Sequence, residues 1–243
     1  GLNNGGYPTQ RSPISIDAIE QLALLISPFD VQYSGFRGST INIVTKSGTN
    51  EFSGSAFYFK YDDSLVGNKS KSTRVPASFD RETYGATLGG PIIRDKLFFF
   101  VSYDKLDGKS PQDFGAVGSG SAIEIPGVTQ AEYDQIVSIA RNVYNFDPLD
   151  RTSSLPEKDE KVLAKLDWNI TDNHRASLAY QRNRDSLIAQ QLNSFTARQL
   201  STPSSWYERA VSLDSYSLQV YSDWTDRFST ELKLGRKEVE TLQ

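Results

Sequence analysis

The feature that most constrains this chain is a series of segments in which apolar and polar residues alternate. In the clearest of these, residues 161–171, the even positions from Val162 to Ile170 are apolar, and Lys165, Asp167 and Asn169 lie between them. A period of two residues is typical of a β-strand, which places successive side chains on opposite faces of a sheet. Similar alternation occurs at 51–61, 81–89, 97–103, 175–182, 215–225 and 228–239. The sequence therefore predicts an all-β antiparallel fold.

The connections between these segments are short and long in turn. Short turns are expected at 91–95, 171–174 and 225–227, and long connections at 62–80, 104–160 and 185–209. Outer-membrane barrels have tight periplasmic turns and long extracellular loops, which gives this strict alternation. The hydrophobic content of only 37% is compatible with such a barrel, because every second side chain of its strands faces a polar lumen. We therefore expect a membrane β-barrel.

The first 46 residues have a different pattern. A polar, Gly- and Asn-rich stretch reaches Pro13, and Ser15 is predicted to cap a short turn at 16–19. Two strand-like runs follow, at 20–26 and 41–46. This part is predicted to form a separate unit that precedes the alternating strands.

One helix is predicted inside the longest connection, from Thr129 to Tyr144. Thr129 is its expected N-cap, and Glu132 stands three residues later, as a capping box requires. The predicted apolar face consists of Ile136, Ile139, Ala140 and Val143.

Composition argues against several classes of function. The net charge is −4 and there is no cationic run, so a nucleic-acid partner is not expected. Cysteine is absent, and the one histidine, His174, lies in a predicted tight turn. The acidic groups at 62–63, 147–150 and 157–160 lack EF-hand spacing and are interpreted as solvated loop acids. We expect no catalytic residues, no metal and no cofactor, and hence no enzyme.

Trp168 and Trp224 each stand just before a short turn, on the apolar side of their strands. Membrane barrels carry aromatic girdles at both interfaces, so these two side chains are predicted membrane-interface residues. The alternative is that they are core residues of a soluble β-sheet.

The region 19–54 resembles the junction between plug and barrel in TonB-dependent receptors. The similar elements are Ile19–Glu20, Ser27–Pro28, Tyr33 to Gly38, Ile41 to Lys46 and Phe52–Ser53–Gly54. Two departures from the family pattern, at Ile26–Ser27–Pro28 and at Tyr33–Ser34, are shared with the Oar-like subfamily. That subfamily also resembles this chain at Thr45 to Phe52 and at Gly89 to Phe100. The resemblance covers roughly the first 105 residues.

The resemblance implies that residues 1–48 are the C-terminal part of a plug domain. Residues 49–243 would then be about seven antiparallel strands, with their extracellular loops, of a roughly 22-stranded transmembrane barrel. The implied location is the outer membrane of a Gram-negative bacterium. The implied function is TonB-dependent transport of an extracellular peptide, glycan or chelate. The alternative is a surface adhesion or assembly protein that keeps this architecture without transport, and a weaker third option is a soluble β-domain.

The resemblance also implies sites and partners. Asn3, Asn4, Tyr7, Gln10 and Arg11 are expected to bind ligand at the plug apex. Asn42 and Lys46 are expected to make polar contacts between plug and barrel. The expected partners are the TonB–ExbB–ExbD complex, acting through a TonB box outside this chain, together with membrane lipid or lipopolysaccharide and a surface lipoprotein.

Overall fold

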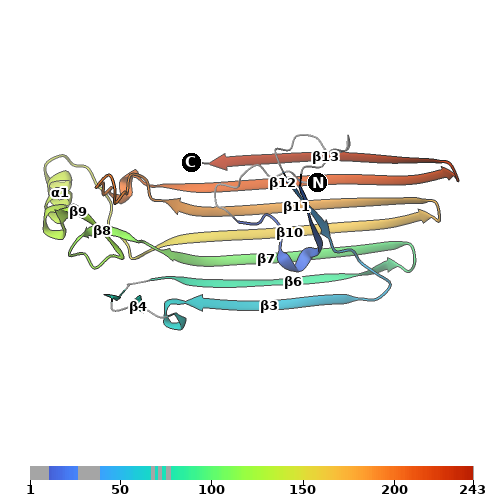
Figure 1. Ribbon diagram of the computed structural model, residues 1–243, viewed down its shortest axis with the longest axis horizontal. Coiled ribbons are helices and arrows are strands. Elements are labelled where there is room, and N and C mark those ends of the chain that lie inside the picture. The colour runs from blue at the N-terminus through green and yellow to red at the C-terminus, as the bar shows by residue number, and fades with distance from the viewer. Residues whose placement is uncertain (1–10, 27–38, 67–68, 71–72, 75–77, 243) are drawn as a thin grey trace.

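The computed structural model describes residues 11–26, 39–66, 69–70, 73–74 and 78–242. Its main element is one antiparallel sheet of seven strands, as Figure 1 shows. The strands are β3 (Ser53–Asp62), β6 (Asp80–Ile93), β7 (Leu97–Pro111), β10 (Ser154–Thr171), β11 (His174–Ala189), β12 (Tyr207–Thr225) and β13 (Phe228–Leu242). They follow the order β13-β12-β11-β10-β7-β6-β3, so the sheet is open and β3 and β13 are its edges in the described part of the chain. The predicted all-β antiparallel architecture is confirmed.

The strands extend further toward the long connections than the sequence predicted. The expected strand 97–103 reaches Pro111, and the strand expected to begin at 161 begins at Ser154. In these extensions charged residues replace the apolar ones, yet the ladder continues without a break, pairing Glu157 with Gly108. The backbone pairing therefore extends beyond the residues that show the apolar alternation. At the other end, β6 continues through Pro91 to Ile93 with a bulge, which shortens the predicted turn.

Two faces of the sheet follow from the pairing register. One row crosses six strands through Ser55, Thr87, Ser102, Leu163, Gln181 and Ser215. We call the face that carries this row the inner face; except for Ser55, every member of the row is at most 9% exposed. The opposite, outer face carries Ala86, Tyr103 and Val162 in the adjacent row.

The N-terminal segment, residues 11–26 and 39–46, crosses the inner face (Figure 1). It contains the 3-10 turn η1 (Ile16–Ala18) and an antiparallel pair of strands, β1 (Ile19–Ile26) and β2 (Ser39–Thr45). The turn occurs where it was predicted, but the cap is different. The Ser15 side chain makes no capping hydrogen bond, and the Ala18 amide bonds to the Ser15 carbonyl.

A small apolar cluster lies between this segment and the sheet. Ile14 and Ala18 pack with Phe100 of β7 and Leu163 of β10, and Ile19 and Ile43 flank them. Beyond the segment, the chain passes close to the sheet at Gly48. A Cβ there would lie 2.3 Å from the Phe99 carbonyl oxygen, so only glycine allows this approach.

A loop unit stands at the end of the sheet opposite the short turns (Figure 1). It comprises β8 (Phe114–Val117) and β9 (Ile123–Thr129), which pair in parallel, and the helix α1 (Gln130–Asn142). Smaller elements in the other long connections are η2 (Asp63–Leu65), β4 (Lys69–Ser70), β5 (Thr73–Arg74) and η3 (Pro203–Ser205). In the described residues, no helix has the length and apolar character needed to cross a membrane.

The predicted helix and its capping box, formed by Thr129 and Glu132, are both confirmed. The predicted apolar face is wrong, because Ile136, Ile139 and Val143 are 55%, 42% and 70% exposed. The buried residue of α1 is Tyr133, over whose ring the Arg151 guanidinium lies. β9 leads directly into α1, so this contact lies next to the first turn of the helix, on its buried side.

Candidate functional site: the contact between the N-terminal segment and the sheet

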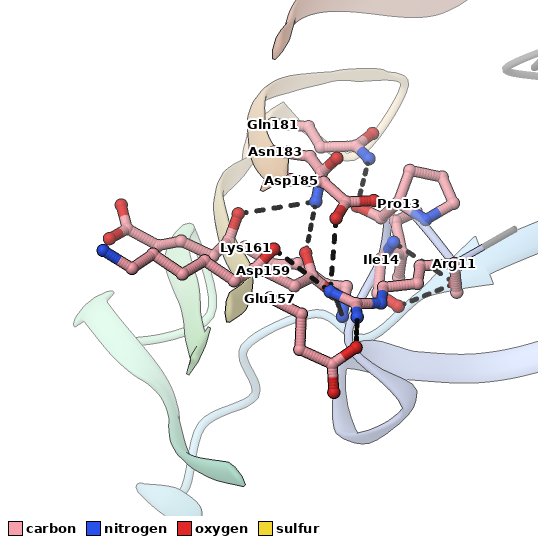
Figure 2. A network of polar contacts seen from close by, with 12 residues as sticks. Arg11, Pro13, Ile14, Glu157, Asp159, Lys161, Gln181, Asn183 and Asp185 are labelled. Atoms are coloured by element: carbon pink, nitrogen blue, oxygen red, sulfur yellow. Dashed lines mark hydrogen bonds and ion pairs between the residues drawn. The ribbon is translucent and has the colours of Figure 1, made fainter. Parts of the chain in front are cut away.

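Arg11 anchors the N-terminal segment to two strands of the inner face, as Figure 2 shows. Its Nη2 lies 2.5 Å from Oε2 of Glu157 on β10, and its Nη1 lies 3.2 Å from Oδ1 of Asp185 on β11. Nη1 also donates to the carbonyl oxygen of Lys158 at 3.1 Å. The side chain of Arg11 is 19% exposed, that of Glu157 5% and that of Asp185 0%. The planar guanidinium thus bridges two buried carboxylates on neighbouring strands.

Further charges complete this network. Arg81 on β6 donates through Nε to Glu157. Lys161 lies 2.6 Å from Asp159, and Asn183 Nδ2 donates to the same carboxylate at 2.9 Å (Figure 2). Burying a carboxylate is costly unless a cation or a hydrogen-bond donor faces it. Within this network, three basic side chains (Arg11, Arg81 and Lys161) face three buried acidic ones (Glu157, Asp159 and Asp185).

Three more hydrogen bonds join the segment and the residue that follows it to the inner face. Gln181 Nε2 donates to the Pro13 carbonyl at 2.9 Å, and Ser55 Oγ donates to Asp17 Oδ2 at 3.2 Å. Lys165 Nζ donates to Ser47 Oγ at 2.7 Å. With the Arg11 contacts, these bonds surround the small apolar cluster. The docking surface is therefore mainly polar.

The interpretation of residues 157–160 as solvated loop acids is wrong. Glu157 and Asp159 are 4% and 3% exposed, because β10 begins at Ser154 and the N-terminal segment covers its inner face. A signal for this was present in the sequence. Glu157, Asp159 and Lys161 continue the two-residue period of the strand without interruption.

Of the predicted plug-apex residues, only Arg11 lies among the described residues, and it points to the sheet. Asn3, Asn4, Tyr7 and Gln10 lie outside them. Asn42 stands in β2 opposite Ala23, and the Lys46 amide donates to the Ala18 carbonyl at 2.9 Å. The role of their side chains at the sheet stays a prediction. The polar contacts described above come from Arg11, Pro13, Asp17 and Ser47, none of which except Arg11 was singled out from the sequence.

On the outer face, Trp168 and Trp224 are 49% and 57% exposed, near the short turns. Trp224 packs on the His174 ring with centroids 4.8 Å apart, and its Nε1 donates to Thr230. The predicted turn histidine is thus the first residue of β11, and it supports an exposed tryptophan.

A second aromatic row on the outer face was not predicted. It consists of Tyr58, Tyr84, Tyr103, Tyr180 and Tyr216, placed on one face by the strand register. Tyr216 stands eight positions before Trp224 on β12, or about 27 Å along a strand. Most side chains between the rows are apolar, as at Leu166, Leu178 and Leu218, and Ser222 is an exception. Two aromatic rows that bound an apolar band are the surface pattern of a transmembrane barrel.

Comparisons with known proteins agree with this reading. Residues 44–119 match the family model described as outer membrane beta barrel domain. The chain is 32% identical to the TonB-dependent transporter Oar of Myxococcus xanthus over 108 residues, which are 42% of this chain and 10% of the relative. It is 31% identical to a probable TonB-dependent siderophore receptor, PirA, of Acinetobacter baumannii over 114 residues, which are 45% of this chain and 14% of the relative. No solved structure matches.

The chain thus spans a small part of the length of both relatives. By their names, one is a TonB-dependent transporter and the other a probable TonB-dependent siderophore receptor. The open antiparallel sheet, its apolar outer band and these partial matches make the chain similar to the barrels of outer-membrane proteins, TonB-dependent transporters among them, and they indicate the outer membrane of a Gram-negative bacterium.

Proposed function

We propose that residues 1–48 are the C-terminal part of a plug and residues 49–243 the first strands and extracellular loops of a barrel of about 22 strands. The protein carries an extracellular ligand across the outer membrane, driven by the TonB–ExbB–ExbD complex. The observation that supports this best is the docking of residues 11–19 on the inner face, with Arg11 between Glu157 and Asp185. The open edges β3 and β13 pair with further strands of the barrel.

The composition of the docking surface suits a plug that must move. Its hydrogen bonds and ion pairs can be replaced by bonds to water when the segment leaves, because water-mediated contacts are nearly as favourable as direct ones. The apolar part is small, with Ile14 and Ala18 as the buried residues on the plug side. Among the described residues, this cluster is the part of the contact that exposes apolar surface to water during movement.

In this proposal, the other predicted sites have the roles expected from the sequence. Asn3, Asn4, Tyr7 and Gln10 precede Arg11 and contact the ligand at the plug apex. Asn42 and Lys46 add polar contacts to the wall. Trp168 and Trp224 lie at the periplasmic interface, and the tyrosine row lies at the lipopolysaccharide side, where a surface lipoprotein also docks.

Cysteine labelling in cells tests the proposal, since the chain has no cysteine of its own. Ser102 is 5% exposed on the inner face, next to Leu163, and Ser102→Cys is nearly isosteric. A membrane-impermeant maleimide should label this cysteine in energised cells that carry TonB, and much more slowly in cells without TonB. Ser138→Cys, exposed on α1, is the control and should react equally in both.

Equal labelling of Ser102→Cys with and without TonB would contradict energised plug movement. An adhesion or assembly protein with the same architecture gives that result, so the experiment also separates the two functions.

A further inference from the structure

The loop unit and the neighbouring chain border an open cavity of about 690 Å³. Its walls are the turn around Gly118 to Ser121, the first half of α1 and the chain from Leu149 to Ser153. A volume of this size accommodates a small ligand or a short oligomer. The loop unit, whose residues line the cavity, stands at the end of the sheet that carries the long connections (Figure 1).

The walls are held in place by a core of their own. Ile125 and Ala116 are 0% and 2% exposed. Arg151 donates to the carbonyl oxygen of Ser201 at 2.8 Å and to that of Phe114, and its guanidinium lies over the rings of Tyr133 and Trp206. This side chain therefore fastens the loop unit to the connection between β11 and β12. A cavity with such walls is formed before any ligand arrives, which lowers the entropic cost of binding.

The lining combines hydrogen-bonding and apolar side chains. Ser119, Ser121 and Gln130 contribute hydroxyl and amide groups, and Val137 and Leu149 contribute apolar surface. Tyr133 also lines the cavity, is 7% exposed, and its hydroxyl has no hydrogen-bond partner among the described residues. A buried hydroxyl is normally bonded, so we expect this group to bond to a water molecule or a ligand once the side chains around it shift to expose it.

The charges narrow the class of ligand. Two carboxylates line the cavity, and both have partners: Asp134 accepts from Gln130 Nε2 at 2.8 Å, and Asp150 accepts from Arg141 Nη2 at 2.9 Å. The one guanidinium in the lining, Arg151, is already bonded to backbone carbonyls and stacked on two rings. An anionic chelate would face the carboxylates without a free cation. A neutral sugar fits better, because it presents hydroxyl groups at its edges and C–H groups on its faces.

We propose that this cavity binds a neutral oligosaccharide. The inference refines the proposed function by naming the ligand class, but binding here does not depend on transport.

The test is isothermal titration calorimetry on the full-length protein in detergent micelles. The probes are maltohexaose, cellohexaose and chitohexaose, with ferric citrate and a neutral hexapeptide for comparison. We expect at least one of the sugars to bind and neither comparison probe to bind. Val137→Trp, which narrows the cavity, and Gln130→Ala, which removes an amide, should each weaken that binding by about tenfold or more. Ser138→Trp, at the neighbouring exposed position of α1, should leave it unchanged.

Failure of all three sugars, stronger binding of the peptide or the chelate, or sugar binding that Val137→Trp and Gln130→Ala leave intact would overturn the proposal. Sugar binding that responds to these variants supports it, whether or not the TonB-dependent labelling of Ser102→Cys is seen. The labelling result bears only on transport.

Discussion

Arg11 Nη1 and Asp185 Oδ1 lie 3.2 Å apart, although 174 positions separate the two residues along the chain. The first belongs to the N-terminal segment and the second to the inner face of β11. This ion pair, with the partner pair to Glu157, holds the segment across strands that the chain forms much later. The guanidinium of Arg11 meets these two carboxylates of the sheet only while the segment is docked.

Arg11→Ala should loosen the N-terminal segment. Removing one partner of a buried ion pair costs about 3–5 kcal/mol, and the lower end applies because Glu157 keeps Arg81. Hydrogen exchange of residues 11–26 in the full-length protein should therefore become faster, while β7 and β10 remain protected. Arg227→Ala, in an exposed turn, is the control. Equal exchange in both variants would show that the ion pairs do not hold the segment.

Leu163→Ala should loosen the same segment through the apolar cluster. Leu163 is 5% exposed and touches the segment, and truncating a buried leucine costs about 2–5 kcal/mol. Leu166→Ala on the same strand is the matched control, because Leu166 is 39% exposed on the outer face. Thermolysin cleavage near residue 11 should increase for the first variant only. Comparable cleavage in both variants would show that the cleavage results from a weakened β10 and not from the lost contact with the segment.

The three tryptophans should report two different environments. In liposomes with brominated lipids, Trp168 and Trp224 should be quenched, because they are exposed on the outer face. Trp206 should not be, since it lies in the loop connection with its Nε1 bonded to Ser201 and its ring against Arg151. Variants that keep one tryptophan each, with phenylalanine at the other two positions, allow the measurement. Strong quenching of Trp206 would contradict the membrane position inferred for the sheet.

Arg151→Gln should separate the two long connections that it joins. The variant loses the stacking on Tyr133 and Trp206, each worth about 0.5–1 kcal/mol or more, and part of the bonding to backbone carbonyls. Hydrogen exchange should increase in 112–153 and in 190–206 together. Arg198→Gln, exposed within the second connection, should not produce the joint change.

Helix α1 should lose its capping box in acid. Bonds from the backbone amide and the hydroxyl of Thr129 hold the pKa of Glu132 below its ordinary value of 4.5. A lowered folded-state pKa contributes stability that is present above pH 4.5 and is lost as the pH falls through the lowered value. Protection of the first turn of α1 should therefore decrease in that range. Glu132→Gln keeps a capping residue that does not titrate, so its protection should be insensitive to this change of pH.

Rules that relate residues close together in the sequence were sufficient to predict much of the fold. The two-residue period located every strand of the sheet, and the spacing of Thr129 and Glu132 located the start of α1. They were insufficient at strand ends, where the pattern changed from apolar to charged while the ladder continued. They were also insufficient for the buried side of α1, which depends on Arg151 rather than on the apolar residues of the helix.

The sequence by itself determined the strands, their connections and the face of each strand that is apolar, because alternation and turn chemistry act between near neighbours. Only the tertiary structure decided which residues contact the polar inner face of the sheet. Arg11 meets Glu157 and Asp185, and Leu163 meets Ile14, only because the N-terminal segment folds across strands that lie far from it in the chain. Pairing over such separations leaves no periodic signal, since it is set by the packing of whole elements and by the cost of burying a charge without a partner.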